Sequence, residues 1–263
     1  MNAVALPLVI ALAAASLHMM ALWFVQRRTG NAGIVDVAWA GTIGALAVFY
    51  AAWPAGIPWL RVLAGGMLAA WSLRLTRYLF VRVVGHPEEG RYRQLRESWG
   101  ENHNAKMFWF YQMQALAAWA FAGNALAVAR SPAPPASWLI ATSVVLWTVG
   151  VSGVAVADRQ LAAFKRDSDS RGKTCRRGLW RYSRHPNYFF EWVHWCSYIP
   201  LAAASAAWWV PVAIAATLLY LLLFVTGIPP TEAQALKSRG DDYREYQRAT
   251  SAFVPWFPRN TTP

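Results

Sequence analysis

Long apolar stretches separated by short charged segments run through the whole chain. The first covers residues 4–25 without a single charge, and Asp36 is the one charged residue in the second. A membrane-spanning helix needs about 20 apolar residues. We therefore predict one span from each of the first five stretches, which cover residues 4–25, 33–60, 62–73, 107–129 and 132–157.

Prolines and charges set the limits of these helices. The second is expected to end near Trp53, where Pro54 and Pro58 begin a turn, and the fifth opens after the proline-rich residues 132–135. The third is the shortest, because three arginines follow its apolar part. We expect its last turns to face protein, water or a ligand instead of lipid; the three cations are Arg74, Arg77 and Arg82.

The longest apolar stretch, residues 185–230, is interrupted by a charge only at Glu191. As one helix it would measure about 69 Å at 1.5 Å per residue, more than twice the roughly 30 Å core of a bilayer. Two helices must share it. The turn is expected near Trp208, Trp209 and Pro211, because tryptophan favours the membrane interface. The total is seven helices, followed by a polar, partly helical tail over residues 231–263.

Composition and charge support a membrane protein. Of 263 residues, 56% are hydrophobic and 14% are charged, whereas soluble domains carry about 25% charged residues. A disordered chain, a coiled coil and a disulfide scaffold are excluded. With seven spans, all Lys and Arg except Arg61 and Arg130 fall on one side. The positive-inside rule then predicts an all-α, multi-pass domain over residues 1–263, with the N-terminus outside and the C-terminus in the cytoplasm.

The net charge of +12 needs no nucleic-acid partner, because a basic cytoplasmic face is usual for membrane proteins. Cys175 and Cys196 have no C-x-x-C spacing, which favours neither a disulfide framework nor a metal site. The histidines show no ligand spacing either, so we expect no metal.

Three acids lie within apolar sequence, namely Asp36, Asp158 and Glu191. An ionised acid in a bilayer is costly, so each is expected to face the bundle interior with a partner. The alternative is a structural ion pair, or a residue at a helix end that meets lipid headgroups.

The surroundings of Glu191 suggest binding chemistry. Pro186 suits the first turn of a helix, and free amides there, with Arg181 and Arg184 beside them, form an anion site. Asn187 and Glu191 are four residues apart on one face and could hydrogen-bond an amide-bearing ring. The dense cations upstream would suit a polyanionic cofactor, or else contact anionic lipid at about 1 kcal/mol per charge; they are Lys165, Arg166, Arg171, Lys173, Arg176 and Arg177.

The segment from Gly178 to Tyr188, GLWRYSRHPNY, with Glu191 after it, resembles the signature of the membrane steroid 5α-reductase-like family. That family shares a superfamily with sterol C14-reductases and isoprenylcysteine carboxyl methyltransferases. Residues 33–39, 158–161 and the W-x-x-R-L at Trp71 are similar to the bacterial branch. Glu232, Gly240, Tyr243 and Tyr246 are spaced like the C-terminal motif of sterol reductases.

This resemblance implies a seven-helix oxidoreductase in the bacterial cytoplasmic membrane, monomeric, with NADPH in a cytoplasm-facing cavity. It would reduce the carbon–carbon double bond of a lipid-like enone, such as a Δ4-3-oxosteroid, by hydride transfer to the β-carbon. The cofactor loop would span residues 159–187. The implied cofactor-binding residues are Arg74, Asp158, Lys165, Lys173, Arg184, His185, Asn187, Tyr188, Glu191, Glu232, Tyr243 and Tyr246.

The resemblance also assigns the catalytic acid to Asp36, kept protonated by burial. Trp71 stands where the steroid enzymes have a catalytic Tyr. An indole donates a hydrogen bond but is no proton reservoir, which argues against a 3-ketosteroid as native substrate; Tyr78 or Tyr111 could supply a hydroxyl instead. Two other functions remain open: an S-adenosylmethionine-dependent membrane methyltransferase, and a non-catalytic lipid-binding or transport protein.

Overall fold

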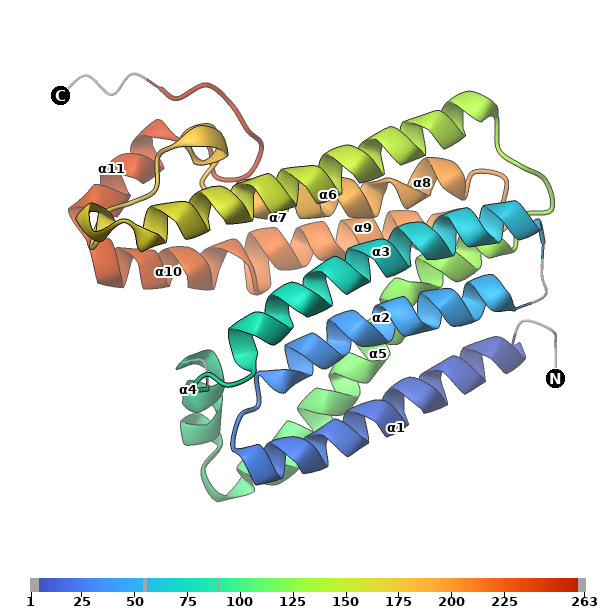
Figure 1. The fold of residues 1–263 in the computed structure, drawn as a ribbon, viewed down its shortest axis with the longest axis horizontal. Coiled ribbons are helices and arrows are strands. Elements are labelled where there is room, and N and C mark those ends of the chain that lie inside the picture. The colour runs from blue at the N-terminus through green and yellow to red at the C-terminus, as the bar shows by residue number, and fades with distance from the viewer. Residues whose placement is uncertain (1–4, 54–55, 89, 260–263) are drawn as a thin grey trace. The chain divides into compact units, whose positions relative to one another are not determined.

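The computed structural model describes residues 5–53, 56–88 and 90–259, and every regular element within those ranges is a helix (Figure 1). Four helical runs are long and apolar enough to cross a membrane. They are α1 (Ala5–Thr29), α2 (Ile34–Ala52), α6 (Ser137–Arg166) and the run Trp209–Arg239. The chain is therefore an all-helical membrane protein.

The chain forms two compact units. The first comprises Met1–Pro134 with Ala204–Val210, and the second comprises Pro135–Ala203 with Pro211–Pro263. The single membrane domain expected from the sequence stays a prediction.

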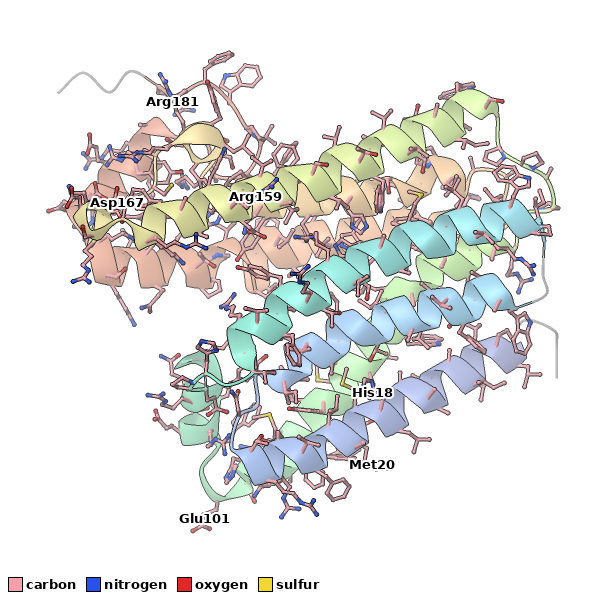
Figure 2. All side chains as sticks on the ribbon, in the orientation of Figure 1. His18, Met20, Glu101, Arg159, Asp167 and Arg181 are labelled. Carbon is pink, nitrogen blue, oxygen red and sulfur yellow. The ribbon has the colours of Figure 1, made fainter. Side chains whose placement is uncertain are left out.

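The first unit is built from α1, α2, α3 (Pro58–Val83) and α5 (His103–Ala129). α2 packs against both α3 and α5, and α1 packs mainly against α5. Small residues allow close approach, as is common between membrane helices: a side chain at Gly44 would overlap Ser72. The Ser72 hydroxyl donates to the Ala40 carbonyl at 2.6 Å, and Thr42 meets His18 of α1 at 2.9 Å (Figure 2).

Two arginines of this unit lie at the same end of it. Gly56, which precedes α3, lies against the carbonyl of Ala129 at the end of α5, so Arg61 and Arg130 share one end of the unit. Arg74 and Arg77 lie inside α3, and the remaining cations lie near the ends of α1, α3 and α5 or in the segment between α3 and α5. Pro54, expected in the turn after α2, lies outside the described residues.

Residues 83–106, expected to be a loop, contain the short helix α4 (Gly90–Trp99) and the 3₁₀ turn η1 (Gly100–Asn102). The sequence of α4 is polar, so no apolar periodicity predicted a helix there. One tyrosine fixes it: Tyr92 is buried and packs edge-on against Phe110, with ring centroids 6.2 Å apart.

The second unit pairs α6 with α7 (Pro186–Cys196). A Cβ at Gly150 would lie 2.6 Å from the backbone nitrogen of His194, so only glycine permits this contact. The predicted sixth helix proves to be divided: α7 ends at Cys196, and α8 (Tyr198–Leu201) and turns over 202–208 follow. The turn predicted near Trp208 is confirmed.

The last apolar helix changes pitch before it ends. After α9 (Trp209–Tyr220) comes η4 (Leu221–Val225), a π-helical turn in which the amide of Thr226 donates to the Leu221 carbonyl at 2.8 Å. The polar helices α10 (Ile228–Arg239) and α11 (Asp241–Ala249) follow. The chain then folds back, so that Phe253 packs against Leu222 and Ile228.

Candidate functional site

A cluster of polar side chains surrounds Asp36 in the first turn of α2. The Tyr92 hydroxyl donates to Oδ1 of Asp36 at 2.8 Å, and Arg91 forms an ion pair with Oδ2. Arg91 also donates to the Tyr92 hydroxyl at 2.9 Å. Both Asp36 oxygens therefore have a side-chain partner, and the protonated state expected from the resemblance stays a prediction.

Tyr92 contributes a protonated hydroxyl to this cluster. Burial, and next the charge of Asp36, raise the pKa of Tyr92 far above its usual value, so its hydroxyl stays protonated and donates. Sequence reasoning missed this residue, because it lies in a polar segment without recognisable periodicity.

The other candidate hydroxyls lie in different settings. Tyr111 is buried and donates to the Ala32 carbonyl at 3.2 Å, which uses its proton for structure. Trp71 is fully buried and meets the ring of Trp39 edge-on at 6.3 Å. Tyr78, in contrast, is exposed on α3 and lines a cavity.

That cavity, the α3 cavity, has a volume of about 940 Å³ and lies along one face of the second half of α3. Its residues recur at helical spacing, so they share a face. Cations alternate with apolar groups along it. The lining residues are Ala70, Leu73, Arg74, Arg77, Tyr78, Val81 and Arg82.

In the second unit, several predicted residues gather around the carboxylate of Glu232. Arg184 donates through Nε to Oε1 at 2.6 Å, and His185 Nε2 lies 3.1 Å from the same oxygen. The Tyr243 hydroxyl donates to Oε1 at 3.3 Å, and Gln247 donates to Oε2 at 2.7 Å. The structure therefore brings together α7, α10 and α11 at this one group, which we call the Glu232 network.

The tyrosines of α11 are structural donors. Burial raises the pKa of Tyr243, and the charge of Glu232 raises it further. Tyr246 donates to the carbonyl of Ser183 at 3.1 Å and also to that of Trp180, so it ties α11 to the segment before α7. Gln247 was missed from the sequence, where nothing distinguishes it.

The start of α7 carries the remaining polar groups. Pro186 begins the helix, as predicted, and Tyr188 stacks on His185 with ring centroids 5.3 Å apart. Glu191 accepts a hydrogen bond from the Trp195 indole at 3.0 Å. Oδ1 of Asn187 is buried and has no hydrogen-bond partner among the described residues. A buried acceptor without a donor is unusual, and it suits a ligand that brings an N–H group.

Three other predicted residues lie in α6 and the loop after it. Asp158, expected at the end of its helix, lies two turns inside α6, which continues to Arg166. Lys165 and Lys173 are exposed, and their role toward a cofactor stays a prediction. Arg176 of the same loop is engaged by the tail, 3.0 Å from both Asp242 and Glu245. Part of the basic loop therefore serves folding.

Within the described residues, no group of three or more His, Cys, Asp or Glu side chains is placed to hold a metal ion. Cys175 and Cys196 are both free thiols, and burial raises the pKa of Cys175.

Comparison with known proteins gives one match. The model of a family described as "Protein of unknown function (DUF1295)" matches residues 22–250. No curated protein and no solved structure matches the chain.

Proposed function

The chain belongs to the DUF1295 family, a steroid 5α-reductase-like group of membrane proteins, and from this premise we propose that it is an NADPH-dependent reductase. Its substrate is a hydrophobic enone, and its product is the saturated ketone. The proposal includes seven spans, with α3, α5 and the α7–α8 segment added to the four apolar runs. It also places the enzyme in the bacterial cytoplasmic membrane with a cytoplasmic C-terminus.

The observation that carries the proposal is the α3 cavity. Its volume of about 940 Å³ lies in the range of small-molecule sites. A cavity beside a membrane helix needs no arginine if it only holds a lipid tail. Cations within a membrane span mark functional sites. Arg74, Arg77 and Tyr78 beside apolar side chains suit an amphipathic occupant with an anionic or carbonyl end.

NADPH fits the polar groups of the second unit. The unpartnered Oδ1 of Asn187 can accept a hydrogen bond from a carboxamide, and Glu191, four residues further, shares the helix face. The cations at the end of α6 and in the following loop can neutralise phosphate, with Lys165 and Lys173 giving charge without the bidentate fork of arginine. When bound, the cofactor would supply the hydride for the β-carbon, and water would supply the proton for the α-carbon.

The protein groups then hold the carbonyl and its developing charge. A protonated hydroxyl is the required donor, and Tyr78 on the α3 cavity and Tyr92 beside Asp36 are the two candidates. The Tyr92 hydroxyl donates its hydrogen bond to Asp36 at 2.8 Å, so Tyr92 can donate to a substrate carbonyl only when this bond to Asp36 is exchanged. Arg74 contributes a fixed positive charge to the cavity wall.

A membrane methyltransferase is the second candidate, because its superfamily shares the His-Pro element at His185–Pro186. S-adenosylmethionine carries no phosphate, so the cations of residues 165–184 would lack a role. A non-catalytic membrane protein would leave the unpartnered Asn187 oxygen without a purpose.

Thermal unfolding of the purified chain separates these functions. NADPH at 100 times its Kd should stabilise the protein by about 2.7 kcal/mol, and S-adenosylmethionine should not. Asn187→Ala should reduce the NADPH shift, whereas the exposed Gln234→Ala should not. A shift with S-adenosylmethionine alone would establish the methyltransferase, and no shift with either would exclude both enzymes.

Activity measurements assign the donor. With a model enone, Tyr78→Phe or Tyr92→Phe should lower kcat by 100-fold or so, the scale of one lost donor to a developing oxyanion. Asp36→Asn tests the role of this carboxylate: unchanged turnover with NADPH bound would remove Asp36 from the mechanism.

A further inference from the structure

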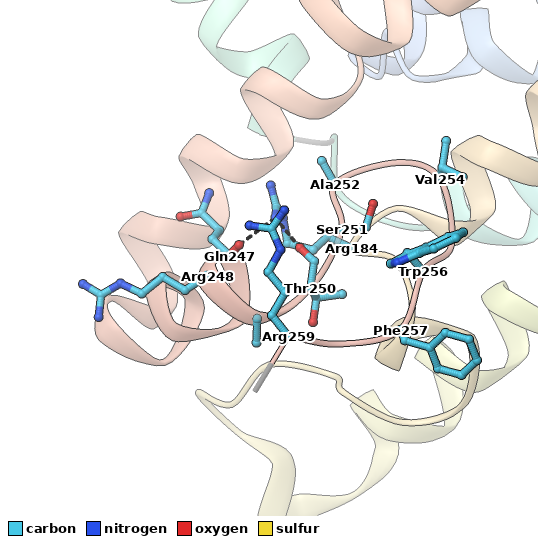
Figure 3. A pocket seen from close by; sticks show the side chains of 11 residues that line it. Arg184, Gln247, Arg248, Thr250, Ser251, Ala252, Val254, Trp256, Phe257 and Arg259 are labelled. Atoms are coloured by element: carbon cyan, nitrogen blue, oxygen red, sulfur yellow. Dashed lines mark hydrogen bonds between the residues drawn. The ribbon is translucent and has the colours of Figure 1, made fainter. Parts of the chain in front are cut away.

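A second cavity lies beside the returning C-terminal segment, within the second unit, and Arg184 is its one lining residue that the resemblance assigned to the cofactor. It has a volume of about 420 Å³, and Figure 3 shows its lining. Three of the eleven lining residues are arginines and none is acidic. They are Arg184, Gln247, Arg248, Ala249, Thr250, Ser251, Ala252, Val254, Trp256, Phe257 and Arg259. We call this the tail cavity.

Two of these arginines are available to a ligand. Arg184 is already engaged, since it donates to Glu232 and to the carbonyls of Gln247 and Thr250. Arg248 and Arg259 are exposed, and no ion pair joins either side chain to an acid in the described part of the chain. In Figure 3, Arg259 extends toward the side of the cavity where Arg184 lies, and Arg248 extends outward from α11.

The rim of the tail cavity is strongly apolar. Val254, Trp256 and Phe257 expose 53%, 70% and 76% of their surface. Their backbone is nevertheless fixed: the Trp256 amide donates to the Tyr182 carbonyl at 2.9 Å, and the Arg259 amide donates to the Ala249 carbonyl at 2.8 Å. The exposure of these side chains is therefore built into an ordered turn.

The packing of Phe253 sets the depth of this segment. Phe253 contacts Leu222 in η4 and Ile228 at the start of α10, both within the run Trp209–Arg239. Residues 254–257 consequently follow a residue that packs near the point where this run passes from apolar to polar sequence. Tryptophan concentrates at this level of a membrane protein, and cations there meet lipid phosphates.

We propose that the tail cavity binds the headgroup of an anionic phospholipid. Arg259 holds the phosphate, Arg248 adds positive charge outside the cavity, and Trp256 and Phe257 enter the boundary between headgroups and acyl chains. Charge complementarity favours an anionic lipid, and the exposed aromatic rim favours a lipid over a soluble phosphate compound. This site would fasten the C-terminal segment to the membrane surface.

Native mass spectrometry of the detergent-solubilised full chain tests the proposal, with phosphatidylglycerol and phosphatidylcholine as probes. Phosphatidylglycerol should bind more tightly. Each arginine near a lipid surface accounts for about fivefold in affinity. The double variant Arg248→Gln, Arg259→Gln should therefore lose about 25-fold, while Arg166→Gln, Arg171→Gln, which removes the same charge from an exposed loop, should not.

Three results would overturn the site: equal binding of the two lipids, equal losses in both double variants, or displacement of the lipid by inorganic phosphate. Displacement by NADPH would also overturn it and would assign the tail cavity to the cofactor. A second pair of changes, Trp256→Ser with Phe257→Ser, should weaken both lipids. Unfolding temperatures should stay unchanged, because neither ring is buried.

Discussion

Each of the two units places a carboxylate beside an arginine and a tyrosine, yet the two carboxylates are used differently. Glu232 accepts from four side chains, and its side chain and that of Arg184 are 13% and 12% exposed. Asp36 meets Tyr92 and Arg91, whose side chain is 57% exposed. Removing one partner from a charge pair excluded from water costs more than removing one from an exposed pair.

This difference in exposure distinguishes Glu232, whose contacts hold the fold together, from Asp36, which is available to a ligand. Glu232 joins residues far apart in sequence, from Arg184 to Gln247, and its capacity to accept hydrogen bonds is filled. The exposed Arg91 can leave Asp36 at little cost, so the Asp36–Tyr92 pair can exchange a partner for a ligand. The first acid serves the fold, and the second retains room for chemistry.

The largest effect is expected at Glu232. Glu232→Gln removes the charge that Arg184 and His185 face and turns one acceptor oxygen into a donor. Leaving a largely buried cation without its partner should cost about 3 kcal/mol, measured as unfolding in detergent micelles. Glu245→Gln removes an acid that is 60% exposed and should cost less than 1 kcal/mol. Equal losses would contradict the structural role of Glu232.

Helix packing gives the next effect and sharpens the comparison of the two units. In Gly150→Ala the new methyl group meets the His194 backbone, which cannot move aside, so we expect a loss of about 2 kcal/mol. Gly44→Ala in the first unit meets the side chain of Ser72 and should cost less.

Gly66 provides the control for both changes, because a Cβ there meets nothing within 4 Å. Gly66→Ala should be neutral or stabilise by up to about 1 kcal/mol, the difference in helix propensity. A destabilised Gly66→Ala would show that these helices tolerate no change, whatever its packing.

The smallest stability effect is expected at the Asp36 cluster. Tyr92→Phe removes one hydrogen bond to a carboxylate that keeps Arg91, and should cost about 1 kcal/mol. Its turnover should fall far more than its stability. Tyr111→Phe, which loses a bond to a backbone carbonyl, should show a similar stability loss with normal turnover; loss of activity in both would contradict a special role for Tyr92.

The sequence predicted the apolar helices well, because charges and prolines delimit them. α1, α2 and α5 lie within a few residues of their predicted spans, and Pro186 begins α7 as expected. α4 was missed, since ten mostly polar residues show no apolar stripe and become helical through the burial of Tyr92. The break after Cys196 was also missed, although Pro200, four residues later, cannot donate a helical hydrogen bond to the Cys196 carbonyl.

The candidate site was predictable only in part. The resemblance named Arg184, His185, Glu232 and Tyr243 together, and the structure places them around one carboxylate. Tyr92 reaches Asp36 only because α4 forms, and Gln247 reaches Glu232 only because α11 follows Gly240 at a positive φ of 55°. Such partners depend on tertiary geometry, which leaves no local pattern in the sequence.

The π-helical turn η4 sets the direction in which Glu232 points. An α-helix advances about 100° per residue, and a wide turn accommodates one residue more than an α-helical turn does. Deleting a residue from Leu221–Val225 would therefore rotate everything beyond it by about that angle and swing the carboxylate away from Arg184. The π-helical turn thus changes the rotation of the helix about its own axis. The apolar helix α9 continues as the polar helix α10, with Glu232 directed toward Arg184.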